Sequence, residues 1–197
     1  MGQAFLAKFT KLGDPLLLLL GALGVFFYLW IADERRSLAR SFALSIALCV
    51  MLTVAGKLVF HLVRWHEETS LRLLSPSGHV AIGTAFYGCC AIMLAGRSGR
   101  AVRRSVAAGT AVLLGMLAGS RVIPGLHSVP EIVVAFAIGG VSLLAFARAS
   151  AKHRQVPLDA AHLVSLVLLI FVAHLAARVD GESLVVLVVA TINAGLH

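Results

Sequence analysis

Long apolar runs recur along this chain and constrain its fold more than any other feature. Each of six runs has about the 17 to 25 residues that an α-helix needs to cross the hydrocarbon core of a bilayer. None alternates polar and apolar residues as the strands of a membrane barrel do, so the runs predict helices. Only 13% of the 197 residues are charged, against about a quarter in a typical soluble domain. The sequence therefore predicts an all-α, polytopic membrane helix bundle with six transmembrane helices, at residues 15–31, 41–62, 77–95, 105–123, 130–147 and 158–178.

The two ends of the chain are interpreted separately. Residues 1–14 place Phe5 and Phe9 on one helical face and the lysines elsewhere, which suits either a short interfacial helix or a disordered start. Residues 183–196 are apolar but would extend about 21 Å as a helix, which is short for a crossing. We expect a short apolar C-terminal segment there, either tilted through the membrane or packed at its surface.

Neither an internal repeat nor a low-complexity linker divides the chain, so residues 1–197 are expected to form a single integral membrane domain.

The net charge of +8 is carried by short loops between the spans rather than by one basic surface. Because lysine and arginine mark the cytoplasmic side of a membrane protein, this charge needs no nucleic-acid partner to explain it. Ten of the 17 lysines and arginines follow the first, third and fifth spans: Arg35, Arg36, Arg40, Arg97, Arg100, Arg103, Arg104, Arg148, Lys152 and Arg154. That side should face the cytoplasm and the opposite ends of the spans the exterior. Compactness and charge pattern together favour a bacterial inner membrane.

Two polar blocks lie at the expected outer ends of the second and third spans. Lys57 and Arg64 are seven residues apart, about two helical turns, so both cations point the same way. Ser75 can cap the third span, Pro76 suits its first turn, and Gly78 lets an anion approach the backbone. A helix N-terminus of this kind can bind phosphate. The alternatives are two cations that extend to the lipid headgroups, and an ordinary helix start with His79 as a bystander.

A third polar block joins the fourth and fifth spans. Ser120 and Arg121 end one span, and His127 and Glu131 flank the start of the next. Four residues separate His127 from Glu131, so the carboxylate can lie beside the imidazole on one helical face. A glutamate bonded to one ring nitrogen would fix the tautomer and leave the other nitrogen free as a nucleophile. Ser128 and Glu131 also fit a capping box, in which the carboxylate only satisfies a backbone N–H, and the two roles can coexist.

Other potential metal ligands lack the spacing of a metal site. His61 and His66 are five residues apart and diverge on a helix, without a His-Glu-x-x-His pattern. Cys49, Cys89 and Cys90 lie inside apolar runs, where we interpret them as packing residues. We therefore expect neither a metal nor another cofactor.

Taken in order, the polar blocks resemble the three-part signature of the type 2 phosphatidic-acid phosphatase superfamily, on Lys57-x6-Arg64, Pro76-Ser77-Gly78-His79 and Ser120-Arg121-x5-His127. That superfamily includes lipid phosphate phosphatases, prenyl diphosphate phosphatases, glucose-6-phosphatase and vanadium haloperoxidases. The resemblance covers about residues 57–131 and departs from the family pattern twice. Trp65 stands where family members usually have proline, and Glu131 stands where aspartate is common.

The resemblance implies a metal-independent hydrolysis of a lipid phosphate or diphosphate, of the prenyl diphosphate or phosphatidate type, at the outer membrane face. It implies that His127 attacks phosphorus to form a phosphohistidine, that Glu131 orients it, and that His79 serves as the acid and base. The phosphate-binding groups would be Lys57, Arg64, Ser77, Gly78, Ser120 and Arg121. The catalytic core would span about residues 41–147. Expected partners are the lipid substrate and membrane lipids, and the sequence leaves a homo-oligomer open.

Two other functions remain compatible with these motifs. A lipid phosphotransferase would use the same phosphohistidine and pass the phosphoryl group to another lipid or glycan. A non-catalytic protein that binds or transports lipid would carry a degenerate form of the site, an interpretation to which Trp65 and Glu131 lend weight.

Overall fold

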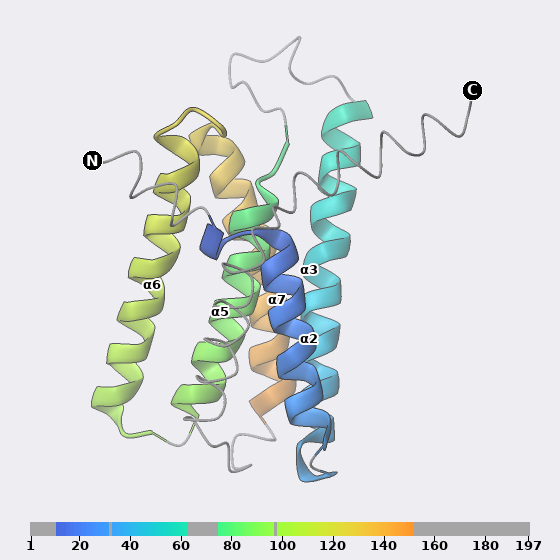
Figure 1. Ribbon diagram of the computed structural model, residues 1–197, viewed down its shortest axis with the longest axis vertical. Helices are drawn as coiled ribbons and strands as arrows, with labels where there is room; N and C mark the ends of the chain where they lie inside the picture. Colours follow the sequence, from blue (N-terminus) through green and yellow to red (C-terminus); the bar gives the residue numbers. More distant parts are fainter. Residues whose placement is uncertain (1–10, 32, 63–74, 97, 152–197) are drawn as a thin grey trace, which may run out of the picture.

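The computed structural model describes residues 11–31, 33–62, 75–96 and 98–151. All regular structure within these ranges is helical, as Figure 1 shows, which confirms the predicted all-α class. The elements described from end to end are α2 (Pro15–Ile31), η1 (Asp33–Arg35), α3 (Arg36–Leu62), α5 (Gly78–Ala95), α6 (Arg100–Val122) and α7 (Val129–Ser150).

Several predictions fall outside the described residues. These are the interfacial segment before residue 11, the sixth span at 158–178, the apolar segment at 183–196, and the positions Arg64, Trp65 and His66. The six-span count therefore stays a prediction.

Four of the described helices are long and apolar enough to cross a membrane: α3, α5, α6 and α7. The fifth, α2, is apolar throughout but has 17 residues, so it is slightly shorter. By length and composition these helices are those of an integral membrane protein. Five of the six predicted spans thus correspond to helices in the described part of the chain.

Near the polar blocks the helix ends agree with the predicted spans. At the other end α2 and α5 end where expected, whereas α3, α6 and α7 extend beyond their predicted spans. Near the polar blocks, α3 ends at Leu62 and α5 begins at Gly78, each within one residue of expectation. At the opposite end, α3 begins at Arg36 and α6 at Arg100, five residues before their apolar runs. Arginine is a good helix former, and its long side chain can extend to the membrane surface. The helix therefore continues past the end of the apolar run, and the run alone underestimates the helix length.

The central helix is α5, which packs against α2, α3, α6 and α7. Small residues let α7 approach it closely: a Cβ atom on Gly139 would lie 2.6 Å from the backbone oxygen of Ala81. A Cβ atom on Gly88 would likewise lie 2.7 Å from Leu143 Cδ2. Glycine at such positions allows two membrane helices to pack at short range. This contact fixes how α5 and α7 lie beside each other, and both helices begin at the same end of the bundle (Figure 1).

Aromatic residues fill the half of the core that lies away from the polar blocks. The ring of Phe42 lies 6.5 Å from that of Phe86 and 6.2 Å from that of Phe146, in edge-to-face arrangements that join α3, α5 and α7. Such pairs contribute about 0.5–1.5 kcal/mol each beyond the apolar area that they bury. Apolar packing thus holds the helices together in the half of the bundle away from the polar blocks. The opposite end is occupied by polar side chains.

Candidate active site

α5 and α7 begin, and α6 ends, at the same end of the bundle (Figure 1). The described residues of the three polar blocks lie at or near these helix ends and the last turns of α3. The last turns of α3 lie beside the segment before α5, since a Cβ atom on Gly56 would be 3.1 Å from Pro76 Cγ. Helix N-termini carry a partial positive charge, and Lys57 and Arg121 add full charges from the late turns of α3 and α6. This end of the bundle therefore suits an anion.

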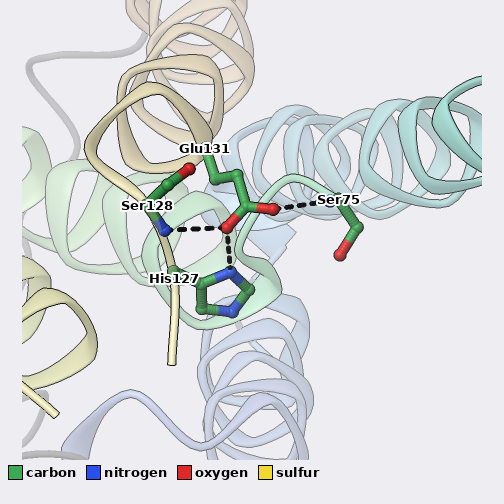
Figure 2. Close-up of polar contacts among 4 residues, drawn as sticks. All are labelled: Ser75, His127, Ser128 and Glu131. Carbon is green, nitrogen blue, oxygen red and sulfur yellow. Dashed lines mark hydrogen bonds and ion pairs between the residues drawn. The ribbon is translucent and has the colours of Figure 1, made fainter. Parts of the chain in front are cut away.

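His127 and Glu131 form the closest side-chain pair of the site. Glu131 Oε2 lies 3.0 Å from His127 Nδ1, and Figure 2 shows the other ring nitrogen, Nε2, facing away from the carboxylate. The side chain of Glu131 is 4% exposed and that of His127 is 16% exposed. Because a carboxylate accepts a hydrogen bond, Nδ1 carries the proton in the neutral ring and Nε2 keeps its lone pair. The pair therefore has the arrangement of an oriented nucleophile.

The same carboxylate also caps α7. The backbone N–H of Ser128 donates to Glu131 Oε2 at 2.9 Å, and Ser128 has the extended backbone of an N-cap residue (Figure 2). Orienting the histidine and capping the helix were alternatives that the sequence left open. Both hydrogen bonds form together, on one oxygen atom.

A third contact of Glu131 links the two motif loops. The backbone N–H of Ser75 donates to Glu131 Oε1 at 2.7 Å, across 56 residues of sequence (Figure 2). Each carboxylate oxygen thus accepts from a different loop. The bond holds the segment before α5 against the start of α7, and with it the position of His79 relative to His127.

The turn before α7 sets the direction of His127. Gly125 has a φ of 76°, a left-handed conformation that favours glycine. Its N–H donates to the oxygen of Val122 at 2.9 Å, and the N–H of His127 donates to the oxygen of Arg121 at 3.1 Å. These bonds close the chain tightly behind the last turn of α6. Arg121 and His127 are therefore brought to the same end of the bundle.

His79 lies in the first turn of α5 and is buried, at 8% exposed. The charges of Arg121, Asp14, His127 and Lys57 all act on its imidazole. These four groups come from near the ends of four different helices, so this end of the bundle places several charges around His79. The structure brings together the histidines and the two described cations that the sequence singled out.

Ser77 and Gly78 form the N-terminus of α5. Ser77 is the N-cap residue and fully buried, and its Oγ has no hydrogen-bond partner among the described residues. A buried hydroxyl without a partner is costly, so a ligand oxygen would satisfy it. At Gly78 an added Cβ atom would meet only Thr53 Cγ2, at 3.9 Å. The first turn of α5 therefore offers both a hydroxyl and an accessible backbone.

The remaining predicted phosphate-binding residues differ in their surroundings. Arg121 is buried, at 5% exposed, whereas Lys57 is exposed. Ser120 is fully buried, and its hydroxyl donates to the oxygen of Leu117 at 2.7 Å. Ser120 therefore already has an acceptor within its own helix. Arg64 lies outside the described residues.

Sequence reasoning missed one acidic residue near these groups. Asp14 is 7% exposed, and its Oδ1 accepts from the N–H groups of Leu16 at 2.9 Å and Leu17 at 3.2 Å. The pattern of residues 1–14 predicted only an interfacial helix or a disordered start. The signal was present, because an aspartate directly before Pro15 and an apolar run is typical of a helix N-cap.

Comparison with known proteins gives a family match. The family model described as PAP2 superfamily matches residues 39–155, more than half of the chain and a range that contains all three motif blocks. Searches of curated proteins and of solved structures found no match. The matched range also contains His79, His127 and Glu131, whose geometry is described above. The chain therefore belongs to the PAP2 superfamily, the type 2 phosphatidic-acid phosphatases that its three polar blocks resemble.

Proposed function

We propose that this protein is a membrane phosphatase that hydrolyses a lipid phosphate or diphosphate through a phosphohistidine at His127. The superfamily generally comprises phosphatases, which supports hydrolysis of a phosphoric ester. The observation that carries the proposal is the 3.0 Å contact between Glu131 Oε2 and His127 Nδ1, because it leaves Nε2 as the nucleophile.

In the first step His127 Nε2 attacks phosphorus in line with the leaving oxygen. The N–P bond forms, the P–O bond to the lipid breaks, and protonated His79 gives its proton to the departing oxygen. The imidazole of His127 becomes positively charged, and the carboxylate of Glu131 stabilises that charge. The lipid leaves as an alcohol, or as a monophosphate when the substrate is a diphosphate.

In the second step water hydrolyses the phosphohistidine. Neutral His79 takes a proton from water as the new O–P bond forms and the N–P bond breaks. Inorganic phosphate leaves, His127 returns to its neutral form, and His79 is again protonated. Two histidines thus divide the nucleophilic and acid-base roles, so this cycle needs no metal.

The negative charge of the transition state is stabilised by fixed cations and dipoles. Lys57, Arg64 and Arg121 bind the nonbridging oxygens, and the N-terminus of α5 adds its dipole. The Ser77 hydroxyl and the Gly78 N–H are further donors, and the former lacks a partner among the described residues. Ser120 would contribute only if its hydroxyl turned away from the oxygen of Leu117.

A substrate with a hydrophobic tail is favoured because the site lies at the end of a bundle of membrane-spanning helices. The arginines at the opposite end, which within the described residues lie in η1, the starts of α3 and α6 and the last turn of α7 rather than in loops, favour a site on the outer face, which in a bacterial inner membrane is the periplasmic side. A small phosphate head on an apolar tail can reach this site from the membrane. The same features accommodate prenyl and glycerol lipids.

The direct test measures phosphate release by purified protein from a prenyl diphosphate, phosphatidate and phosphatidylglycerol phosphate, with and without chelator. We expect release from at least one substrate, unchanged by chelator, and none by His127→Ala. The control is Val112→Ala, because Val112 is exposed on α6 and away from the motif blocks. Robust turnover by His127→Ala would contradict the mechanism.

The same assay separates the alternatives. With a substrate labelled at phosphorus, hydrolysis places the label only in inorganic phosphate, whereas phosphotransfer places it in another lipid or a glycan. Binding of a lipid phosphate without turnover of any substrate would favour the non-catalytic function.

A further inference from the structure

The register of α2 and α5 brings Asp14 to His79. Leu18 lies beside Gly83, and one helical turn later Gly21 lies beside Phe86, so the two helices run in the same direction with a constant offset. The same offset, one turn earlier, pairs Asp14 with His79. The charge of Asp14 accordingly acts on the imidazole of His79.

Two further contacts fasten the segment that carries Asp14. The Tyr87 hydroxyl of α5 donates to the backbone oxygen of Leu12 at 2.7 Å. Gly13 packs directly against the side chain of Leu117 in α6, where there is no room for a Cβ atom. Asp14 is therefore held between α5 and α6, whose ends form the site.

Helix capping alone does not require an aspartate at this position. Asp14 Oδ1 caps α2 by accepting from Leu16 and Leu17, a role that asparagine or serine performs about equally well. Burying a carboxylate is costly unless other charges compensate it. The four described groups whose charges act on His79 are three basic residues and this one acid. The negative charge is thus placed where the bases Arg121, His127 and Lys57 would repel a protonated His79.

We propose that Asp14 is a positioning residue that stabilises the protonated imidazole of His79 and so supports its transfer of a proton to the leaving oxygen. The proposal rests on the proposed function, since it assigns a partner to the acid in the same reaction. Asp14 does not touch the phosphate. Its proposed effect on the reaction passes through the charge on His79.

The test compares two leaving groups. An alkyl phosphate, such as a lipid phosphate, needs a proton on its leaving oxygen, whereas the p-nitrophenolate of p-nitrophenyl phosphate leaves without one. Asp14→Asn keeps the cap and removes the charge. We expect its kcat/KM, which reports the steps up to departure of the leaving group and not the later hydrolysis of the phosphohistidine, to fall about 10- to 100-fold with the alkyl substrate, within the range of general acid catalysis, and much less with the aryl substrate.

His79→Ala should lose activity with the same preference for the aryl substrate. The double variant Asp14→Asn/His79→Ala should lose no more than His79→Ala alone, because a residue that acts through another is not additive with it. Asp14→Ser, which also caps without charge, repeats the test if the asparagine variant folds poorly. Thermal unfolding checks the fold of each variant.

Equal losses with both substrates would mean that Asp14 only caps α2, and would overturn the inference. Full activity of Asp14→Asn with the alkyl substrate would overturn it as well, while leaving the proposed function intact if His127→Ala is inactive. Wild-type protein that releases no phosphate from any substrate would instead overturn the proposed function and this inference together.

Discussion

Two charged residues of the site, Glu131 and Arg121, and two arginines at the other end of the bundle meet opposite physical conditions. At the site, Glu131 and Arg121 are 3% and 5% exposed. At the other end, the guanidinium groups of Arg36 and Arg40 are exposed, and each lies 5.6 Å from the centre of the Trp30 ring. Exclusion of water strengthens an electrostatic interaction, whereas water and salt weaken it at a surface. Burial at a given position in the bundle, rather than residue type, therefore decides which charged side chains can act strongly on a bound substrate.

The largest expected effect comes from Glu131→Gln at the buried end. The amide keeps the size of the side chain but can no longer accept hydrogen bonds at both terminal atoms, as Glu131 does from His127, Ser128 and Ser75. By analogy with a catalytic aspartate changed to asparagine, kcat should fall about 10²- to 10⁴-fold. Steady-state phosphate release measures the loss. Full activity in this variant would show that Glu131 only caps α7 and does not orient His127 for catalysis.

Gly139→Ala should disturb the packing that sets the site. The new Cβ atom would lie 2.6 Å from the backbone oxygen of Ala81, so α5 and α7 must separate. Overpacking of this kind costs about 1–3 kcal/mol. We expect a lower unfolding temperature in detergent together with reduced activity.

The matched control for that packing test is Gly140→Ala, one residue further along α7. A Cβ atom there would meet nothing within 4 Å. Its unfolding temperature and activity should stay close to wild type. Alanine forms helix better than glycine, so helix propensity alone would raise rather than lower the stability of both variants. Equal destabilisation by both would therefore show that close contact between Gly139 and α5 is not the cause.

Ser77→Ala sharpens the comparison at the site itself. The hydroxyl is buried without a described partner, so its removal should leave stability unchanged or slightly raised. If it binds phosphate, kcat/KM should fall about 10-fold, equivalent to about 1.4 kcal/mol, the size of one hydrogen bond. Thermal unfolding and phosphate release together separate these effects. A destabilised variant with unchanged kcat/KM would assign Ser77 to packing instead.

The smallest effect is expected at the exposed end, from Arg40→Gln. The interaction of an exposed arginine with an aromatic ring contributes about 0.5–1 kcal/mol. Activity should stay within about twofold of wild type, since Arg40 lies at the end of α3 remote from the site. A loss of activity comparable to that of Glu131→Gln would show that the two ends are coupled.

Local patterns predicted much of the fold and part of the site. Apolar runs located the described spans, and helix starts were expected within a residue of Gly78 and Val129. The sequence predicted the pairing of His127 with Glu131 from a four-residue spacing on one helical face. The contact forms, but His127 lies just before the N-cap of α7, and the capping bond from Ser128 to the same carboxylate oxygen brings the two side chains together. The apolar runs begin five residues after α3 and α6 do, because the first turns of both helices carry arginines. The single domain and the outward orientation stay predictions.

Contacts between helices were beyond prediction from one sequence. Ser75 bonds to Glu131 across 56 residues, and the register of α2 against α5, set by Leu18 beside Gly83, places Asp14 level with His79. Neither could be predicted from the spacing of residues in the sequence, because that spacing determines which residues are close in space only within one helix.

The sequence by itself determined that this protein is a bundle of apolar helices and that its motif residues lie at helix ends. It also determined the family, through residue types at fixed local intervals. Only the tertiary structure decided which helix ends meet. Close packing at Gly139 and the alignment of Leu18 with Gly83 set the direction and register of α2, α5 and α7. Packing between helices is a property of surfaces distant in sequence, and it converts separate motifs into one site.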